Sequence, residues 1–180
     1  LVGSEMCIRD RIRLGTQPID TFDDGFDLLL AFDWENVSRF ADEIPLRSTG
    51  LVVGDSDAGE PPPVFLAGGA RYVGVPLKKT AKSIAGSWVN MVALGLAGTL
   101  AGLSAQALAA ALRDSWKRAE EGLRANLAAL DAGIAAAAGV AATHPIERLP
   151  EAAALAGASR RWLISGNEAA GYGAIRGGIR

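Results

Sequence analysis

Three apolar runs alternate with turn signals in the first half of the chain. The runs cover residues 26–32, 50–55 and 70–76, and glycine, proline or aspartate residues bound them. A continuous apolar run that is too short for a helix is typical of a strand buried on both faces of a parallel sheet. Helical spacing of apolar residues over 34–44 predicts a helix capped by Asp33. This alternation of strands with a helix predicts a parallel α/β sheet.

The chain before the first of these runs carries weaker signals. A brief alternation over 11–15 predicts a short strand, and residues 23–25 predict a turn. Residues 1–11 show no clear period, no signal-peptide architecture and no helix cap. They resemble sequencing-adapter DNA translated in frame, so we interpret them as a sequencing artefact that includes the only cysteine, Cys7. The natural chain is then expected to begin further upstream.

The second half of the chain is predicted to be helical. Residues 83–112 include no charged side chain, a length that would by itself allow a membrane span. Internal glycines and polar residues favour instead two helices over about 87–101 and 104–117, the second capped by Ser104. The first of these is apolar on nearly all sides and is expected in the interior or at an interface. Leucine and isoleucine at three- to four-residue spacing predict a further helix over 118–138.

A change of pattern after this helix predicts a domain boundary. Residues 139–159 contain two prolines and are interpreted as a linker, with His144 in an exposed loop. A basic and then apolar segment over 160–165 predicts a strand that leads into a glycine-rich helix over 169–179. The glycines of residues 171–173 fall inside that helix, so close helix packing is preferred there over a dinucleotide-binding loop.

Composition and charge narrow the possible functions. The 180 residues are 49% hydrophobic and 21% charged, which indicates a folded domain rather than intrinsic disorder. Eighteen basic and twenty acidic residues leave a net charge of −2, which argues against a nucleic-acid partner. One cysteine and one histidine are too few for a structural zinc site or an iron–sulfur cluster. The 22 glycines and few aromatic residues suit closely packed helices.

Residue types and spacing alone identify no catalytic constellation. Asp33 and Asp55 end predicted strands at the carboxyl edge of the sheet, where α/β proteins bind ligands, but we prefer to interpret them as caps of a helix and a turn. Lys78, Lys79 and Lys82 suit either an anionic ligand or, as we prefer, a solvated helix face.

Five segments, taken in order, resemble the 2-oxoacid:ferredoxin oxidoreductase family. The first four resemble the gamma domain of these enzymes, and the fifth resembles the opening of their alpha domain. The segments are Leu28–Asp33 with Glu35, Gly50–Asp55, Val75–Leu77, Asn90–Gly95, and Ile164–Ala170 with Gly173 and Ala174. A gamma domain fused ahead of an alpha domain resembles the alpha subunit of the 2-oxoglutarate:ferredoxin type, and the resemblance covers residues 12–180.

The resemblance implies a fold and a division of the chain. Residues 12–138 would be a gamma domain without its N-terminal glycine-rich part, with a three-layer α/β sheet and an appended helical segment. Residues 139–159 would be a linker. Residues 160–180 would be the truncated start of an α/β domain of the thiamine-binding (pyrimidine-binding) type.

The resemblance also implies the chemistry of a whole enzyme, which is thiamine-dependent, coenzyme A-linked oxidative decarboxylation of a 2-oxoacid. In this family the beta subunit carries thiamine diphosphate, Mg and the iron–sulfur cluster. We therefore expect this chain alone to hold no cofactor, metal or catalytic residue. Gly166, Asn167 and Glu168 match the entry motif of the alpha domain, where the glycine allows a tight turn and the short polar residue caps the helix.

The expected partners are the beta subunit and ferredoxin as electron acceptor, without nucleic acid or membrane, in a cytoplasmic enzyme. Two other interpretations of the sequence stay open. One is a non-catalytic α/β domain that binds a nucleotide or another small ligand. The other is an apolar helical module that binds a membrane or a partner protein.

Overall fold

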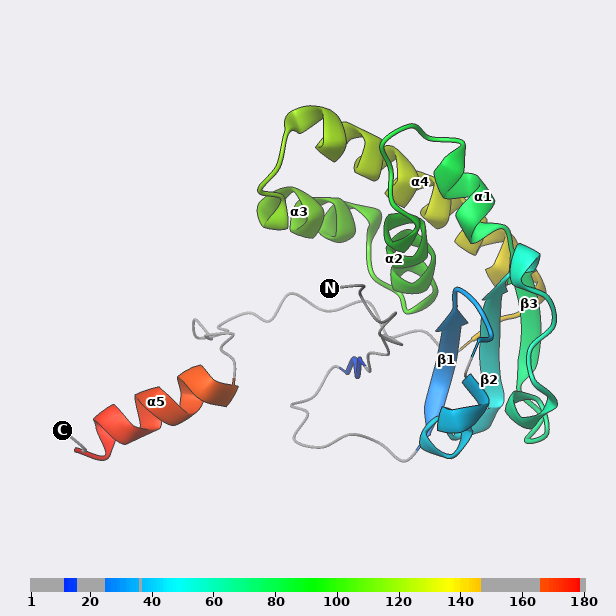
Figure 1. The fold of residues 1–180 in the computed structure, drawn as a ribbon, viewed down its shortest axis with the longest axis horizontal. Helices are drawn as coiled ribbons and strands as arrows, with labels where there is room; N and C mark the ends of the chain where they lie inside the picture. Colours follow the sequence, from blue (N-terminus) through cyan, green and yellow to red (C-terminus); the bar gives the residue numbers. More distant parts are fainter. Residues whose placement is uncertain (1–11, 16–24, 36, 147–165, 179–180) are drawn as a thin grey trace, which may run out of the picture.

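Parallel strands form the centre of the fold in a computed structural model that describes residues 12–15, 25–35, 37–146 and 166–178. The strands are β1 (Phe26–Ala31), β2 (Leu46–Asp55) and β3 (Arg71–Val75), and they lie side by side in that order (Figure 1). Both neighbouring pairs are parallel. The predicted parallel α/β sheet is therefore confirmed.

The central strand β2 is the most deeply buried. Leu51 and Val53 point to one face of the sheet and Val52 to the other, and none of the three has exposed surface. By contrast, β1 pairs only with β2 in the described part of the chain, and most of its residues are half-buried. The prediction that residues 26–32 are buried on both faces is therefore wrong, because β1 is an edge strand here. Residues 12–15 form no strand, which also departs from the prediction.

The segment between β1 and β2 is a 3-10 helix, η1 (Val37–Glu43), and not the predicted α-helix over 34–44. The side chain of Asp33 does not cap it: its Oδ1 accepts a hydrogen bond of 3.1 Å from the Glu35 N–H and closes a local turn. Trp34, Val37 and Phe40 recur every three residues, which fits the three residues per turn of a 3-10 helix.

One face of the sheet is covered by η1 and by the loop between β2 and β3. That loop contains two short 3-10 turns, η2 (Ser56–Ala58) and η3 (Pro63–Phe65). Phe65 and Ala70 are buried against Val52, and half-buried apolar residues of η1 pack around them. The proline-rich loop between β2 and β3 is thus a packed layer of the fold.

Helices cover the opposite face of the sheet (Figure 1). The covering helices are α1 (Leu77–Lys82), α2 (Val89–Leu100) and α4 (Glu120–Thr143). Helix α3 (Ala105–Ser115) packs on α2 and α4, and α5 (Gly166–Arg176) follows later in the chain. Ser104 caps α3 as predicted, since its hydroxyl accepts a hydrogen bond of 3.1 Å from the Ala107 N–H. The predicted helix over 118–138 runs on to Thr143, so the first five residues of the predicted linker are helical.

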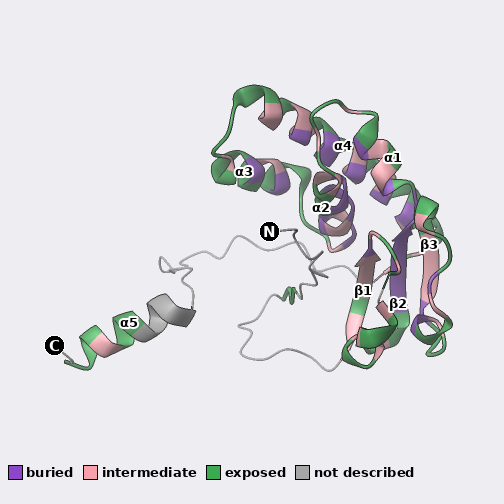
Figure 2. Cartoon of the chain, in the orientation of Figure 1, coloured by how far each residue is buried: buried purple, intermediate pink, exposed green. Residues whose placement is uncertain are grey.

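The core of the helical layer is the contact between α2 and α4. Figure 2 shows buried residues along β2 and on the facing sides of these two helices. Gly95 of α2 faces the backbone of Leu130, and Gly133 of α4 faces the backbone of Val92. A Cβ at either glycine would overlap a backbone carbonyl oxygen, so both glycines are required for this close approach of the two helices.

The uncharged run over 83–112 is not one helix. It forms α2 and α3, of 12 and 11 residues, which are too short to cross a bilayer. Within the described ranges, α4 is long and apolar enough to pass that test by length and composition. Its buried face packs against α2, as the core helix of a folded domain would, so this test does not indicate a membrane span.

Candidate functional site

The carboxyl edge of the sheet is organised around the buried side chain of Asp55. Asp55 is the last residue of β2 and has 0% exposed surface. Its Oδ2 accepts a hydrogen bond of 2.8 Å from the Lys78 N–H at the start of α1, and its Oδ1 accepts one of 3.0 Å from the Asp57 N–H. Because both carboxylate oxygens hold neighbouring backbone, the geometry supports the interpretation of Asp55 as a cap.

An aromatic cluster closes the loop beside this edge. The Trp34 ring centroid lies 6.3 Å from that of Phe65 and 6.4 Å from that of Tyr72. The Gly59 carbonyl accepts a hydrogen bond of 3.2 Å from the Trp34 indole N–H and one of 3.4 Å from the Tyr72 hydroxyl. These contacts fasten the loop after β2 over the sheet, so the aromatic side chains here have a structural use.

The surroundings of Tyr72, beside this edge, raise the pKa of its phenol. Burial raises the pKa of its phenol, and the negative charges of Glu60 and Asp55 raise that pKa further. The phenol therefore keeps its proton at neutral pH and donates to Gly59. A tyrosine held in this way is a hydrogen-bond donor and not a general base.

The predicted basic residues lie together on α1. Lys79 and Lys82 are exposed, and Lys78 is half-buried. The contact from this helix to the carboxyl edge uses the backbone N–H of Lys78 and not its ammonium group. The placement agrees with the preferred interpretation of these lysines as a solvated helix face.

A polar groove lies at the opposite, amino-terminal edge of the sheet. It encloses about 480 Å³. It is bounded by β1, β2, the first residue of β3 and the chain just after α4, through the residues Asp27, Ser48, Thr49, Arg71, Pro145 and Ile146. Charged and hydroxyl residues thus lie beside the apolar residues Pro145 and Ile146 along this groove.

An irregularity in strand pairing forms the wall of this groove. Phe26 pairs with Leu46, but Leu28 pairs with Leu51, so β2 contributes extra residues opposite Asp27. Bulges of this kind bend a strand and re-aim its side chains, and they are frequent next to functional sites. Here the bulge places the exposed residues Ser48 and Thr49 at the groove.

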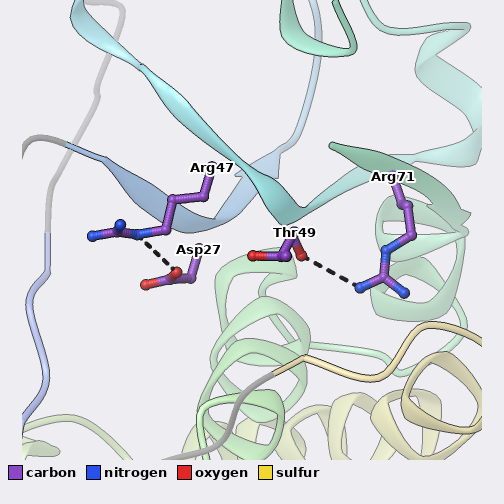
Figure 3. A network of polar contacts seen from close by, with 4 residues as sticks. All are labelled: Asp27, Arg47, Thr49 and Arg71. Atoms are coloured by element: carbon purple, nitrogen blue, oxygen red, sulfur yellow. Dashed lines mark hydrogen bonds and ion pairs between the residues drawn. The ribbon is translucent and has the colours of Figure 1, made fainter. Parts of the chain in front are cut away.

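Two arginines make polar contacts at the groove: Arg47 forms an ion pair, and Arg71 donates hydrogen bonds to backbone carbonyls (Figure 3). The Arg47 Nε lies 3.1 Å from Oδ1 of Asp27, on the strand that it faces. The Arg71 Nη2 donates a hydrogen bond of 2.7 Å to the Pro145 carbonyl and a longer one of 3.4 Å to the Thr49 carbonyl. Arg71 therefore connects β3 and β2 to the chain that leaves α4. Sequence analysis did not single out Arg71, and only its position at the start of a predicted strand could have drawn attention to it.

Of the remaining predicted residues, only His144 has a side chain that the structure describes. Gly166, Asn167 and Glu168 begin α5, but their side chains lie outside the described residues, so their structural role stays a prediction. Cys7 also lies outside the described residues. His144 follows the last residue of α4, is half-buried, and its Nδ1 lies 2.8 Å from the Thr143 hydroxyl.

The cysteine content of the sequence and the acidic side chains of the described residues do not suit an iron–sulfur cluster or a bound metal ion. The sequence has one cysteine, whereas an iron–sulfur cluster needs several thiolates. In the described ranges, no three His, Cys, Asp or Glu side chains gather to hold a metal ion such as the Mg that accompanies a diphosphate. No step of a reaction is therefore derived through such a group on this chain.

Comparison with known proteins identifies a family and a similar solved structure. The profile of a family described as pyruvate ferredoxin/flavodoxin oxidoreductase matches residues 8–136. A solved structure of 2-oxoglutarate:ferredoxin oxidoreductase from Magnetococcus marinus, with 2-oxoglutarate, coenzyme A and succinyl-CoA bound, is similar with a TM-score of 0.69 and 31% identity. That similarity covers 87% of this chain and 27% of the solved chain, so the present chain spans about a quarter of its length. No curated protein matches the chain.

Proposed function

The chain belongs to the pyruvate ferredoxin/flavodoxin oxidoreductase family, and we propose that it is the gamma domain, joined to the start of an alpha domain, of a 2-oxoacid:ferredoxin oxidoreductase. The observation that carries the proposal is the similarity to the 2-oxoglutarate enzyme over 87% of the chain. It extends past the family match at residue 136, which supports the order of a gamma domain followed by further sequence of the same enzyme.

In the proposed reaction the bond between the carboxylate and the keto carbon of a 2-oxoacid breaks and carbon dioxide leaves. The acyl carbon forms a thioester with coenzyme A, whose thiol proton is released. An electron pair passes to the acceptor, a ferredoxin. The solved relative was obtained with 2-oxoglutarate, coenzyme A and succinyl-CoA, which makes 2-oxoglutarate the first substrate to test.

We infer a division of work between subunits from the residues of this chain. Thiamine diphosphate supplies the electron sink for decarboxylation when it is bound, and clusters accept the electrons. The family resemblance implies that a beta subunit carries these groups, and the single cysteine among these 180 residues, too few to ligate a cluster, agrees with that division. The buried polar side chains here hold backbone instead, as Asp55 does for α1. The contribution of this chain is then a folded scaffold within a cytoplasmic enzyme.

A domain exchange tests the proposal. Residues 12–146 replace the matching segment of the Magnetococcus marinus enzyme, and the chimera is produced with the partner subunits of that enzyme. We expect reduction of a viologen dye that depends on 2-oxoglutarate and coenzyme A, whereas the isolated 180-residue chain should reduce none. His144→Ala in the chimera should change turnover by less than about threefold, because a residue remote from the reacting atoms stabilises a transition state little.

Co-purification of the chimera with the partner subunits is the control for assembly. An assembled chimera without activity would contradict the proposal. Dye reduction by the isolated chain would contradict the division of work between subunits. High affinity of the isolated chain for a nucleotide, together with an inactive assembled chimera, would favour a separate ligand-binding domain.

A further inference from the structure

We propose that the polar groove at the amino-terminal edge of the sheet binds the carboxylate of a small metabolite, with Arg71 as its anchor. This proposal rests on the geometry of the groove and does not depend on the reaction proposed above. Its volume of about 480 Å³ lies in the range of small-molecule pockets. The argument rests on one guanidinium, two hydroxyls and one neutralised acid that meet in the groove.

Arg71 is held in place before any ligand arrives. Its Nη2 donates to the Pro145 carbonyl at 2.7 Å and to the Thr49 carbonyl at 3.4 Å, which fixes the plane of the guanidinium. Its other two nitrogens have no hydrogen-bond partner among the residues that the structure describes. A planar guanidinium with free N–H groups matches the two oxygens of a carboxylate. Preorganisation lowers the entropic cost of binding such a ligand.

Ser48 and Thr49 supply further donors from the bulge in β2. Both side chains line the groove, and neither hydroxyl is hydrogen-bonded to a described residue. These hydroxyls can donate to a carboxylate bound in the groove, because a carboxylate oxygen accepts more than one hydrogen bond. The bulge thus places two neutral donors beside one cation.

The acid in the groove selects the charge of the ligand. Asp27 is exposed, and Arg47 compensates its charge from the neighbouring strand at 3.1 Å. A second negative charge close by would still be repelled, so a phosphate, which carries ≈ −1.5 to −2 at pH 7, fits less well than a monoanion. Pro145 and Ile146 give the groove an apolar side that suits a short aliphatic chain. These features together favour a small aliphatic carboxylate.

Calorimetric titration of the 180-residue chain tests the site with defined probes. Propionate and butyrate are the monoanionic carboxylates, propionamide is the neutral match for propionate, and inorganic phosphate tests the alternative anion. We expect saturable binding of the carboxylates and weaker or no binding of the other two. Arg71→Gln should weaken carboxylate binding tenfold or more, since a charge-assisted hydrogen bond is lost.

Two further variants separate binding from folding. Arg71→Gln also removes the contact to Pro145, so Ser48→Ala/Thr49→Val is the second test, because it leaves both Arg71 hydrogen bonds in place. It should weaken carboxylate binding severalfold with an unchanged circular dichroism spectrum. Arg113→Gln, an exposed residue on α3, is the control and should bind as the parent chain does. Absence of saturable binding, equal binding of propionamide or phosphate, or full affinity in both groove variants would overturn the assignment.

Discussion

Replacement of Gly133 by alanine should separate α2 from α4 and destabilise the fold. The added Cβ would overlap the Val92 carbonyl oxygen, and it would lie 2.9 Å from the Val92 carbonyl carbon and 3.0 Å from the Leu96 nitrogen. All three obstacles are backbone atoms, so no change of side-chain conformation can relieve the clash. The helix axes must move apart by roughly 1.5 Å before the Val92 carbonyl oxygen reaches the normal contact distance of about 3.5 Å.

The size of the effect follows from two opposing contributions. Overpacking of a well-filled core costs about 1–3 kcal/mol, and a backbone obstacle places this substitution at the upper end. Alanine is the better helix former by about 1 kcal/mol, which offsets part of that cost. The expected net loss is about 2 kcal/mol of unfolding free energy. For a chain of this length that loss corresponds to a decrease of about 4–8 °C in the thermal midpoint.

Gly139 provides a matched control in the same helix. It lies in α4 like Gly133, but a Cβ added there meets no atom within 4 Å. Gly139→Ala therefore gains the helix propensity without the clash and should stabilise by about 0.5–1 kcal/mol. Thermal and urea unfolding followed by far-ultraviolet circular dichroism measure both variants. If Gly133→Ala were as stable as Gly139→Ala, the contact between the two helices would not be as close as described.

Three other changes have defined expected outcomes. Asn126 has 0% exposed surface, accepts a hydrogen bond of 3.0 Å from the Trp88 N–H and donates one of 2.8 Å to the Gly122 carbonyl, so Asn126→Leu should cost about 1–3 kcal/mol in urea unfolding. Asn90→Leu at an exposed position is its control, expected within about 0.5 kcal/mol of the parent. Because the pKa of Tyr72 is raised in the folded chain, its contribution to stability is complete below pH 10 and is lost as pH rises through the folded-state pKa. The thermal midpoint of Tyr72→Phe should therefore fall less between pH 9 and 11 than that of the parent chain, and an identical fall would refute the argument. Deletion of residues 1–11 should leave the thermal midpoint unchanged, and a decrease of several degrees would show that they belong to the fold.

The central strand could be predicted from the sequence because burial on both faces leaves a continuous apolar run. A strand in the middle of a parallel sheet is buried on both faces, so residues 50–55 form a continuous apolar run that is visible in the sequence. The same pattern in 26–32 predicted too much burial, because the number of neighbouring strands is not encoded within one strand. The η1 segment was assigned to the wrong helix type, since three- and four-residue spacings coincide over so short a stretch.

The contacts that matter most for packing and for the groove were not predictable. Gly95 and Gly133 lie far apart in the sequence. A side chain at either position would clash only because α2 and α4 pack together there in the folded chain. Arg71 and Pro145 are likewise distant in sequence and meet only in the folded chain. The sequence could predict an abundance of glycine for close packing, but it could not predict which glycines make the contact.

The two edges of the sheet differ in what they leave available for a ligand. At the carboxyl edge, where α/β proteins usually bind ligands, both oxygens of Asp55 are occupied by backbone N–H groups and the Tyr72 hydroxyl donates to Gly59. At the amino-terminal edge, Arg71 keeps free N–H groups beside the unoccupied hydroxyls of Ser48 and Thr49. A ligand gains most where donors are already ordered but not yet bonded, because little further ordering is needed. Within the described residues, the proposed groove therefore offers unbonded donors at the amino-terminal edge, whereas the polar groups of Asp55 and Tyr72 at the carboxyl edge already have partners.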